Sequence, residues 1–269
     1  SGLATGVSAA EHGASVLVLE KEARPGGTTA ISIGSYTAAG TPLQQQAGIV
    51  DSVEAHEEDT AQFAAPEIEA RNNYDLRHFF LTHSADTLRW LMKMGIAFYG
   101  PSPEPPNRVP RMHNVVPGSQ AYIATLQARF LRVGGTLLCR APVTDLVQHE
   151  NRITGVIAQV GGRTTQFTAR RGVVLAAGYF HPQRLARFQE ERFRQIDSIT
   201  AIASGDGHLL AERAGGQLVN MDIAFGPNIS FVAPPRRKTL LDWLPVSGPL
   251  ARLVGRLTPL APGPLIQAV

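Results

Sequence analysis

Residues 15–21 read Ser-Val-Leu-Val-Leu-Glu-Lys, and this stretch decides the fold that the sequence predicts. Its first five residues form a nearly continuous apolar run, which is typical of a parallel strand buried on both faces. Residues 3–12 before it are small and rich in alanine, and Gly13 ends them as a helix C-cap would. A helix that leads into a buried parallel strand predicts an α/β fold.

The position of Glu20 at the end of this strand indicates a dinucleotide-binding unit. Such a unit has glycines where a pyrophosphate approaches the first helix, and an acidic residue after the second strand that accepts ribose hydroxyls. Gly2 lies 11 residues before Gly13 and suits the third glycine of G-x-G-x-x-G, so we expect the first two glycines and their strand before Ser1. The alternative, with Gly2 and Gly6 as the motif itself, leaves too short a helix and no strand in front.

A turn rich in glycine and hydroxyl groups follows the strand. Residues 25–30 read Pro-Gly-Gly-Thr-Thr-Ala, and Ser32 comes shortly after. Glycine N–H groups and the hydroxyls of threonine and serine are suitable donors for pyrophosphate oxygens and for the edge of a flavin ring. Glu20 alone has a plainer interpretation, because a charged residue often ends a buried strand for solubility. The turn that follows it favours ribose binding.

The rest of the chain predicts one α/β domain with an inserted antiparallel meander. Helices are expected over residues 75–94, 120–133 and 206–214. Short strands are expected over residues 136–138, 143–148, 153–160 and 166–169, and residues 172–178 return to the buried parallel type. The composition then shifts to proline, arginine and scattered leucine. We therefore expect a first domain over residues 1–224, and over residues 225–269 a linker or the start of a cap domain.

Four motifs in order along the chain resemble one family. They are L-V-L-E-K at 17–21, G-G-T-T-A-I-S-I-G at 26–34, G-V-V-L-A-A-G at 172–178 and S-G-D-G-H-L-L-A at 204–211. The sequence resembles the FAD-binding domain of the fumarate reductase and succinate dehydrogenase flavoprotein superfamily over about residues 2–222, and looks closest to soluble dehydrogenases related to 3-ketosteroid dehydrogenases. The resemblance implies a Rossmann-like FAD-binding domain without its first strand, with an inserted antiparallel meander and the start of a cap domain.

The resemblance also implies which residues bind FAD. Gly2 would belong to the pyrophosphate turn, Glu20 would accept the adenosine ribose, and Lys21 lies beside it. The residues expected to line the diphosphate and the flavin are Gly26, Gly27, Thr28, Thr29 and Ser32. The residues expected near the adenosine are Val143, through its backbone, Ala177 and Gly178. Asp206 matches the acidic residue of the family's G-D-G motif, although it has an alternative role as the cap of the following helix.

The activity that the resemblance implies is that of an FAD-dependent oxidoreductase acting on CH–CH bonds. Hydride would pass between flavin N5 and an activated carbon of a small-molecule substrate, either desaturating C–C or reducing C=C. The succinate and fumarate enzymes carry a substrate histidine shortly after the methionine that matches Met221, whereas this chain continues Asp222-Ile223-Ala224. A steroid-like or other apolar enone is therefore favoured over a dicarboxylate by elimination, and no catalytic residue is assigned.

Two other hypotheses stay open. In the first, the chain is a non-catalytic fragment of such a flavoprotein that does not hold FAD alone, because removing the central strand of a parallel sheet exposes two unpaired edges. In the second, the chain is a nicotinamide-dependent dehydrogenase. The G-G-T-T-A and G-D-G motifs argue against the second hypothesis.

Composition argues against several other classes of protein. The chain has no apolar run of about 18 residues, so we expect no integral membrane segment. Its 25 Lys and Arg residues are scattered among 22 Asp and Glu, so we expect no nucleic-acid partner. The single Cys139 fits a reducing compartment, and we expect a cytoplasmic protein with this thiol buried. The histidines lack metal-ligand spacing, so no metal is expected, and His113 is expected on an exposed loop rather than in a cleft.

Overall fold

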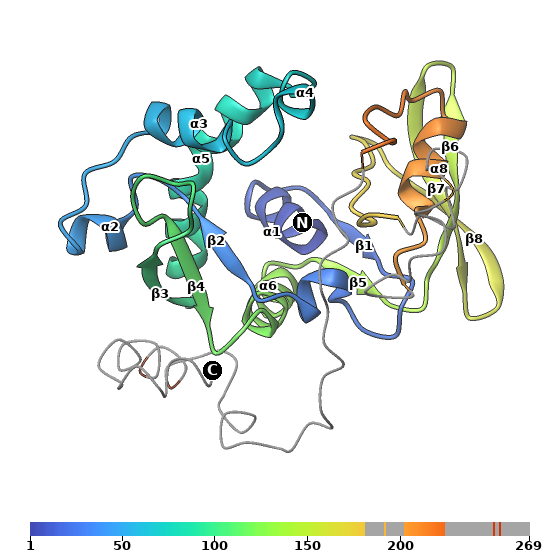
Figure 1. Cartoon of the computed structure of the whole chain (residues 1–269). Helices are drawn as coiled ribbons and strands as arrows, with labels where there is room; N and C mark the ends of the chain where they lie inside the picture. The colour runs from blue at the N-terminus through green and yellow to red at the C-terminus, as the bar shows by residue number, and fades with distance from the viewer. Residues whose placement is uncertain (181–190, 192–201, 224–249, 251–252, 254–269) are drawn as a thin grey trace. The chain divides into compact units, whose positions relative to one another are not determined.

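The computed structural model describes residues 1–180, 191, 202–223, 250 and 253 (Figure 1). The chain divides into two compact units. The first unit joins Ser1–Thr28 to Leu126–Ile229, and the second joins Thr29–Thr125 to Ser230–Val269. The expected linker or cap segment, 225–269, lies outside the described residues except for Leu250 and Leu253.

The first unit contains the predicted helix and parallel strand. Helix α1 covers Gly2–Glu11, and β1, Leu17–Leu19, pairs in parallel with β5, Thr136–Leu138. Helix α6, Gln120–Arg132, comes before β5, and the ring of its Phe130 is fully buried. A Cβ at Gly6 would lie 3.0 Å from this ring, so glycine allows α1 to approach it closely.

Two predictions about burial in this unit are wrong. Leu17 is 37% exposed, so β1 is not buried on both faces. Residues 172–178, expected as a buried parallel strand, form no strand, and Val174 is 68% exposed. A strand needs backbone partners along its edges. Among the described residues the end of this segment makes one isolated bridge, Phe180 to Ser204, so its apolar side chains have no neighbouring strand to bury them.

The predicted antiparallel meander is confirmed over residues 143–168, whereas residues 136–138, expected to belong to it, form β5 and pair in parallel with β1. Strands β6, β7 and β8 are hydrogen-bonded in that order and cover Val143–His149, Arg152–Val160 and Arg163–Thr168. The turn between β7 and β8 uses Gly161 and Gly162 at φ angles of 56° and 77°, which glycine adopts without strain. Helix α8, Asp206–Arg213, packs beside β6, where Nη2 of Arg213 donates to the Thr144 carbonyl at 2.8 Å.

The second unit holds a small antiparallel sheet that the sequence pattern does not predict. Its strands lie in the order β2-β4-β3 and cover Ser35–Thr37, Met112–Val116 and Ala97–Ser102. The helices are α2, Pro42–Gln46, α3, Val53–Thr60, α4, Pro66–Glu69, and α5, Tyr74–Lys93; the 3-10 helix η1, Gly27–Ile31, precedes β2. His113, expected on an exposed loop, is fully buried in β4, where its Nε2 lies 2.8 Å from the Thr41 hydroxyl. The short strands and polar residues of this sheet give little alternation for a pattern to detect.

Helix α5 buries only part of its predicted apolar set. Asn73 caps the start of the helix by accepting a hydrogen bond from the Leu76 N–H at 2.9 Å. Leu88 is fully buried and Leu91 is 5% exposed, whereas Leu76 and Phe79 are each 63% exposed. Residues three and four apart share a helix face. The later turns therefore face the core, and the first turns present apolar side chains to solvent.

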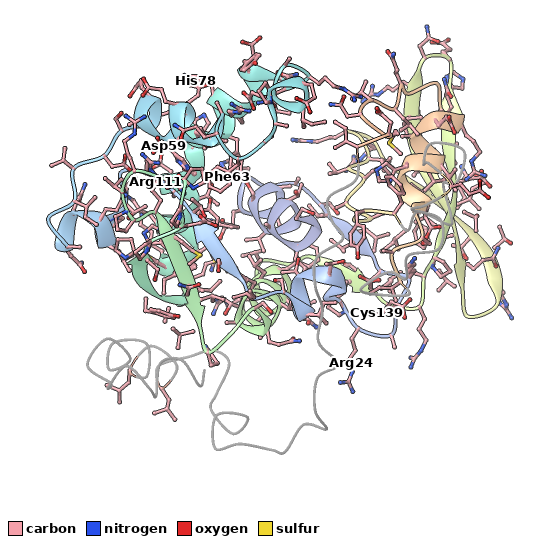
Figure 2. The ribbon with its side chains drawn as sticks, viewed as in Figure 1. Arg24, Asp59, Phe63, His78, Arg111 and Cys139 are labelled. Carbon is pink, nitrogen blue, oxygen red and sulfur yellow. The ribbon has the colours of Figure 1, made fainter. Side chains whose placement is uncertain are left out.

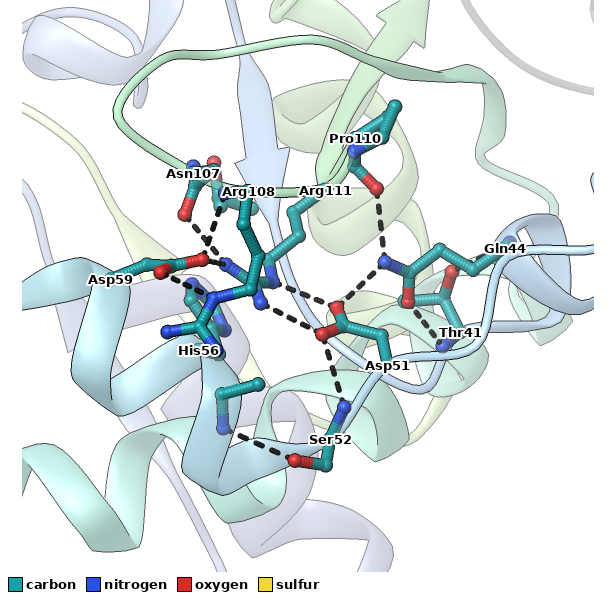
Figure 3. Close-up of polar contacts among 12 residues, drawn as sticks. Thr41, Gln44, Asp51, Ser52, His56, Asp59, Asn107, Arg108, Pro110 and Arg111 are labelled. Carbon is teal, nitrogen blue, oxygen red and sulfur yellow. Dashed lines mark hydrogen bonds and ion pairs between the residues drawn. The ribbon is translucent and has the colours of Figure 1, made fainter.

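A fully buried arginine ties together three segments of the second unit (Figure 3). The Arg111 guanidinium makes two parallel hydrogen bonds to Asp51, from Nε to Oδ2 and from Nη2 to Oδ1, both at 2.7 Å. Its Nη1 donates to Asp59 Oδ2 at 2.6 Å, and Asp59 also accepts from the backbone N–H and Nε of Arg108. Gln44 donates to Asp51 Oδ2 at 2.8 Å. Because an unpaired buried charge is costly, these partners are what permit Arg111 in the interior.

The same network shifts the pKa values of two residues on α3. Burial, together with the positive charge of Arg111, lowers the pKa of His56 from 6.5 to about 4, and its Nδ1 has no hydrogen-bond partner. Burial alone would raise the pKa of Asp59, but hydrogen bonds from the Arg108 N–H and from the two guanidinium groups lower it from 3.8 to about 2. At neutral pH His56 is therefore neutral and Asp59 is charged.

We expect acid to weaken the second unit through His56. Because the folded-state pKa of His56 lies below its unfolded value, its contribution to stability is complete above pH 6.5 and is lost as the pH falls toward about 4. Between about pH 7 and pH 4, the free energy of unfolding should fall less in His56→Gln than in wild type, by roughly 2–3 kcal/mol, as measured by urea titration. Equal slopes in His56→Gln and wild type would contradict the assignment.

The first and the later turns of α5 should respond differently to truncation. Leu88→Ala removes a fully buried side chain and should lower the free energy of unfolding by about 3 kcal/mol. Leu76→Ala, at a position 63% exposed on the same helix, should change it by less than about 0.5 kcal/mol. Urea unfolding at neutral pH measures both values, and similar losses in the two variants would show that the first turn of α5 is covered.

Candidate functional site

Backbone hydrogen bonds continue the pairing of β1 and β5 beyond both strands. The Glu20 N–H donates to the Leu138 carbonyl at 2.8 Å, and the Ala141 N–H donates to the Glu20 carbonyl at 2.9 Å. The Arg140 N–H donates to the Glu22 carbonyl at 2.9 Å. Because β1 and β5 run in parallel, these bonds lie at the carboxyl ends of both strands, which is the edge where open α/β sheets bind ligands.

Glu20 is held at this edge by its own surroundings. Its side chain is half-buried, and Oε1 accepts a hydrogen bond from the Glu22 N–H at 2.9 Å. A carboxylate fixed at the end of a strand is suited to accept ribose hydroxyls, which is the role that the sequence predicts for it. The structure places Glu20 at the required strand end, and its contact with a ribose stays a prediction.

Lys21 and Asp206, both predicted to contact FAD, lie against each other. Nζ of Lys21 donates to Asp206 Oδ2 at 3.0 Å, with the two side chains 29% and 44% exposed. Ser204 joins the pair, because Nζ of Lys21 also donates to its Oγ, and this hydroxyl in turn donates to Asp206 Oδ2 at 2.6 Å. The start of α8 is thereby attached to the residue that follows Glu20.

The start of α1 also reaches this region of the first unit. A Cβ at Gly2 would lie 3.3 Å from the Cβ of Ala176, and a Cβ at Gly207 would lie 3.0 Å from the Cβ of Ala177. The segment that contains the predicted residues 177 and 178 therefore lies close to the starts of both α1 and α8. Ser1 makes no side-chain cap bond, so it leaves the N–H groups of the first turn of α1 to other acceptors, and such groups bind anions.

Val143 follows the same edge of the sheet. It is the first residue of β6, pairs with Ala158 of β7, and comes two residues after Ala141, whose N–H is bonded to Glu20. Because Ala141 is hydrogen-bonded to Glu20, the backbone of Val143 lies within two residues of a contact with the carboxyl end of β1. This placement is compatible with its predicted contact with adenine.

The predicted diphosphate and flavin turn lies where the two units meet in sequence. Gly26 and Gly27 have φ angles of 153° and 51°, which favour glycine. Thr28 ends the first segment of the first unit, and Thr29 begins the second unit. Ser32 donates its hydroxyl hydrogen to the Thr29 carbonyl at 2.8 Å, so in this conformation the hydroxyl is used within the turn.

Ser204 is the polar residue of this region that sequence reasoning missed. It opens the S-G-D-G motif, yet the sequence analysis singled out only Asp206 from that motif. Its partner Lys21 is 183 residues away in the chain, and no local pattern reports a contact over that separation. The one signal available was that a hydroxyl residue directly precedes the G-D-G tripeptide.

The described residues contain neither a metal-binding cluster nor a membrane-spanning helix. No group of three or more His, Cys, Asp or Glu side chains that could hold a metal occurs in the part of the chain that the structure describes. Among the same residues, no helix is long and apolar enough to cross a membrane. Cys139, expected to be buried, is half-buried. Figure 2 labels this residue just after β5, and Arg24 in the segment after β1.

These residues fit the adenosine diphosphate part of FAD. A carboxylate at a strand end suits ribose hydroxyls, and a helix start without a cap from Ser1 suits a pyrophosphate. At Gly2 the absence of a side chain leaves room where a Cβ would approach Ala176. The residues that could hold FAD thus come from α1, the end of β1, residues 176–178 and the start of α8.

Known proteins resemble this chain over most of its length. Residues 1–237 match the family described as FAD binding domain. The probable fumarate reductase Ifc3 of Shewanella frigidimarina is 26% identical over 230 residues, which cover 82% of this chain and 38% of that protein. Urocanate reductase of Eggerthella lenta is 29% identical over 237 residues, which cover 82% of this chain and 37% of that protein. The chain therefore spans less than two fifths of the length of these two relatives.

A solved structure supports the fold. The 3-ketosteroid-Δ4-(5α)-dehydrogenase of Rhodococcus jostii RHA1 has a TM-score of 0.72 at 24% identity, over 82% of this chain and 53% of that chain. This likeness confirms the expected Rossmann-like fold with its antiparallel meander. Because the family match covers residues 1–237, the chain belongs to the FAD binding domain family, and FAD is its cofactor.

Proposed function

We propose that the intact protein is an FAD-dependent oxidoreductase acting on CH–CH bonds. FAD would supply the hydride chemistry at N5, and the protein would supply binding, orientation and electrostatics. The observation that carries this proposal is the gathering of Glu20, the start of α1 and residues 176–178 at the carboxyl end of β1. The names of the two curated relatives support the reaction class, because fumarate and urocanate each contain a carbon–carbon double bond conjugated to a carboxyl group.

The proposed FAD contacts follow from the placement of the residues. Glu20 would accept the adenosine ribose hydroxyls, and Gly2 would allow the pyrophosphate to approach α1. The remaining proposed contacts are Lys21, Gly26, Gly27, Thr28, Thr29, Ser32, Val143, Ala177, Gly178 and Asp206. Residues 1–224 would form the FAD-binding domain, and residues 225–269 a linker or the start of a substrate cap domain.

The proposed substrate is a small molecule with an activated C–C or C=C bond. The absence of histidine directly after Met221 supports an apolar enone over a dicarboxylate, because a dicarboxylate needs polar partners of this kind. We also propose a cytoplasmic location, which the single Cys139 supports because it fits a reducing compartment.

A spectrum tests the binding of FAD to this chain. The purified 269-residue chain, incubated with FAD and passed through a desalting column, should elute with a visible flavin band. A colourless protein after this treatment would favour the non-catalytic fragment, a hypothesis that the exposed residues 172–178 support. Binding of NADH by a chain that retains no FAD would favour the nicotinamide-dependent enzyme.

A substitution at Glu20 tests the ribose contact. Glu20→Gln keeps the size of the side chain but removes the charge that strengthens its hydrogen bonds, so the dissociation constant for FAD should rise about tenfold. Glu22→Gln, two residues further on, is the matched control and should bind FAD as wild type does. Flavin fluorescence titration measures all three proteins. Equal affinities of wild type and Glu20→Gln would show that Glu20 ends the strand for solubility alone.

A further inference from the structure

The side chains of Lys21, Ser204 and Asp206 form a closed triangle of hydrogen bonds. Lys21 Nζ donates to both other residues, and the Ser204 hydroxyl donates to Asp206. Both donors converge on the same oxygen of Asp206, its Oδ2. Two donors on one carboxylate oxygen fix the rotation of that carboxylate more strongly than one donor would.

The triangle joins two segments that are far apart in the sequence. Lys21 directly follows Glu20 at the carboxyl end of β1, and Asp206 begins α8. Gly205 before it has a φ angle of 74°, and Ser204 is paired with Phe180 through an isolated bridge. The backbone that carries Asp206 is therefore held on both sides, which leaves the side-chain contacts to set the direction of its carboxylate.

The Asp206 side chain is more exposed to solvent than the Lys21 side chain. The Lys21 side chain is 29% exposed, while that of Asp206 is 44% exposed. A ligand at the end of β1 can thus reach Asp206 more readily than Lys21. Two of the three N–H donors of the ammonium group are already used within the triangle, so most of its hydrogen bonding is directed at its neighbours.

We propose that Lys21 and Ser204 are positioning residues, which hold the Asp206 carboxylate in the direction from which it binds FAD. This inference rests on the proposed function and refines it, because the family resemblance suggests a direct FAD contact for Lys21. The lysine also offsets the negative charge of Asp206, which would otherwise oppose the binding of an anionic diphosphate. Lys21 acts through Asp206, and Ser204 supplies the second hydrogen bond.

A double-mutant cycle on FAD affinity separates positioning from direct contact. Flavin fluorescence titration of the full 269-residue chain gives dissociation constants for wild type, Lys21→Met, Asp206→Asn and the double variant. Each single substitution should weaken FAD binding about tenfold, and the double variant should be weakened by about the same tenfold. Ser204→Ala should weaken binding about threefold, because one of two donors is lost. Lys21→Arg, which keeps the charge and the donors, should restore affinity to within about threefold of wild type.

A lysine outside the triangle serves as the control. Lys93→Met, an exposed lysine at the end of α5, should bind FAD as wild type does, and urea unfolding midpoints confirm that each variant is folded. A loss of about a hundredfold in the double variant would mean that Lys21 contacts FAD independently of Asp206. Wild-type affinity in Lys21→Met would mean that Lys21 neither contacts FAD nor positions Asp206. Either result overturns this inference and leaves the proposed function standing. A wild-type chain that binds no FAD overturns the proposed binding and this inference together.

Discussion

The parallel ladder between β1 and β5 is the constraint on which the site depends. Each strand is only three residues long, yet the hydrogen bonds continue through Glu20 and Glu22 to residues 138–141. These hydrogen bonds fix the backbone between the end of β1 and the residues of the site. Glu20 and Lys21 therefore leave the sheet in fixed directions. The start of α8 is held against Lys21 by a further hydrogen bond, and Ala141, two residues before β6, is bonded to Glu20.

Much of the first unit could be predicted because its signals are local. The apolar run before Glu20, the alanine-rich stretch before Gly13 and the alternating segments of the meander are each visible in a short window of sequence. Such signals need no knowledge of which segments become neighbours in the fold. The failure at residues 172–178 has the opposite cause. Their composition is that of a buried strand, but a strand is defined by hydrogen bonds to other strands, and the described residues supply no ladder for it.

In the candidate site, too, local positions could be predicted and long-range contacts could not. The positions of Glu20 after a strand and of Gly2 at the start of a helix could be predicted, since both follow from chain geometry, while their contacts with FAD stay predictions. The partnership of Lys21 with Ser204 could not, because the two residues are 183 positions apart and the contact exists only after folding. The buried pairing of Arg111 with Asp51 was missed for the same reason: nothing in the sequence distinguishes it from the exposed charges around it.

The exposed segment at residues 172–178 has a consequence for the behaviour of the chain in solution. It presents Val174 and Leu175, 68% and 41% exposed, on backbone that belongs to no strand. Within the part of the chain that the structure describes, these two residues join no ladder, and apolar chain outside a ladder is a template on which another polypeptide can add as a strand. Concentrated samples of this chain would therefore self-associate through intermolecular β-structure. Low protein concentration and mild temperature would favour the monomer during purification.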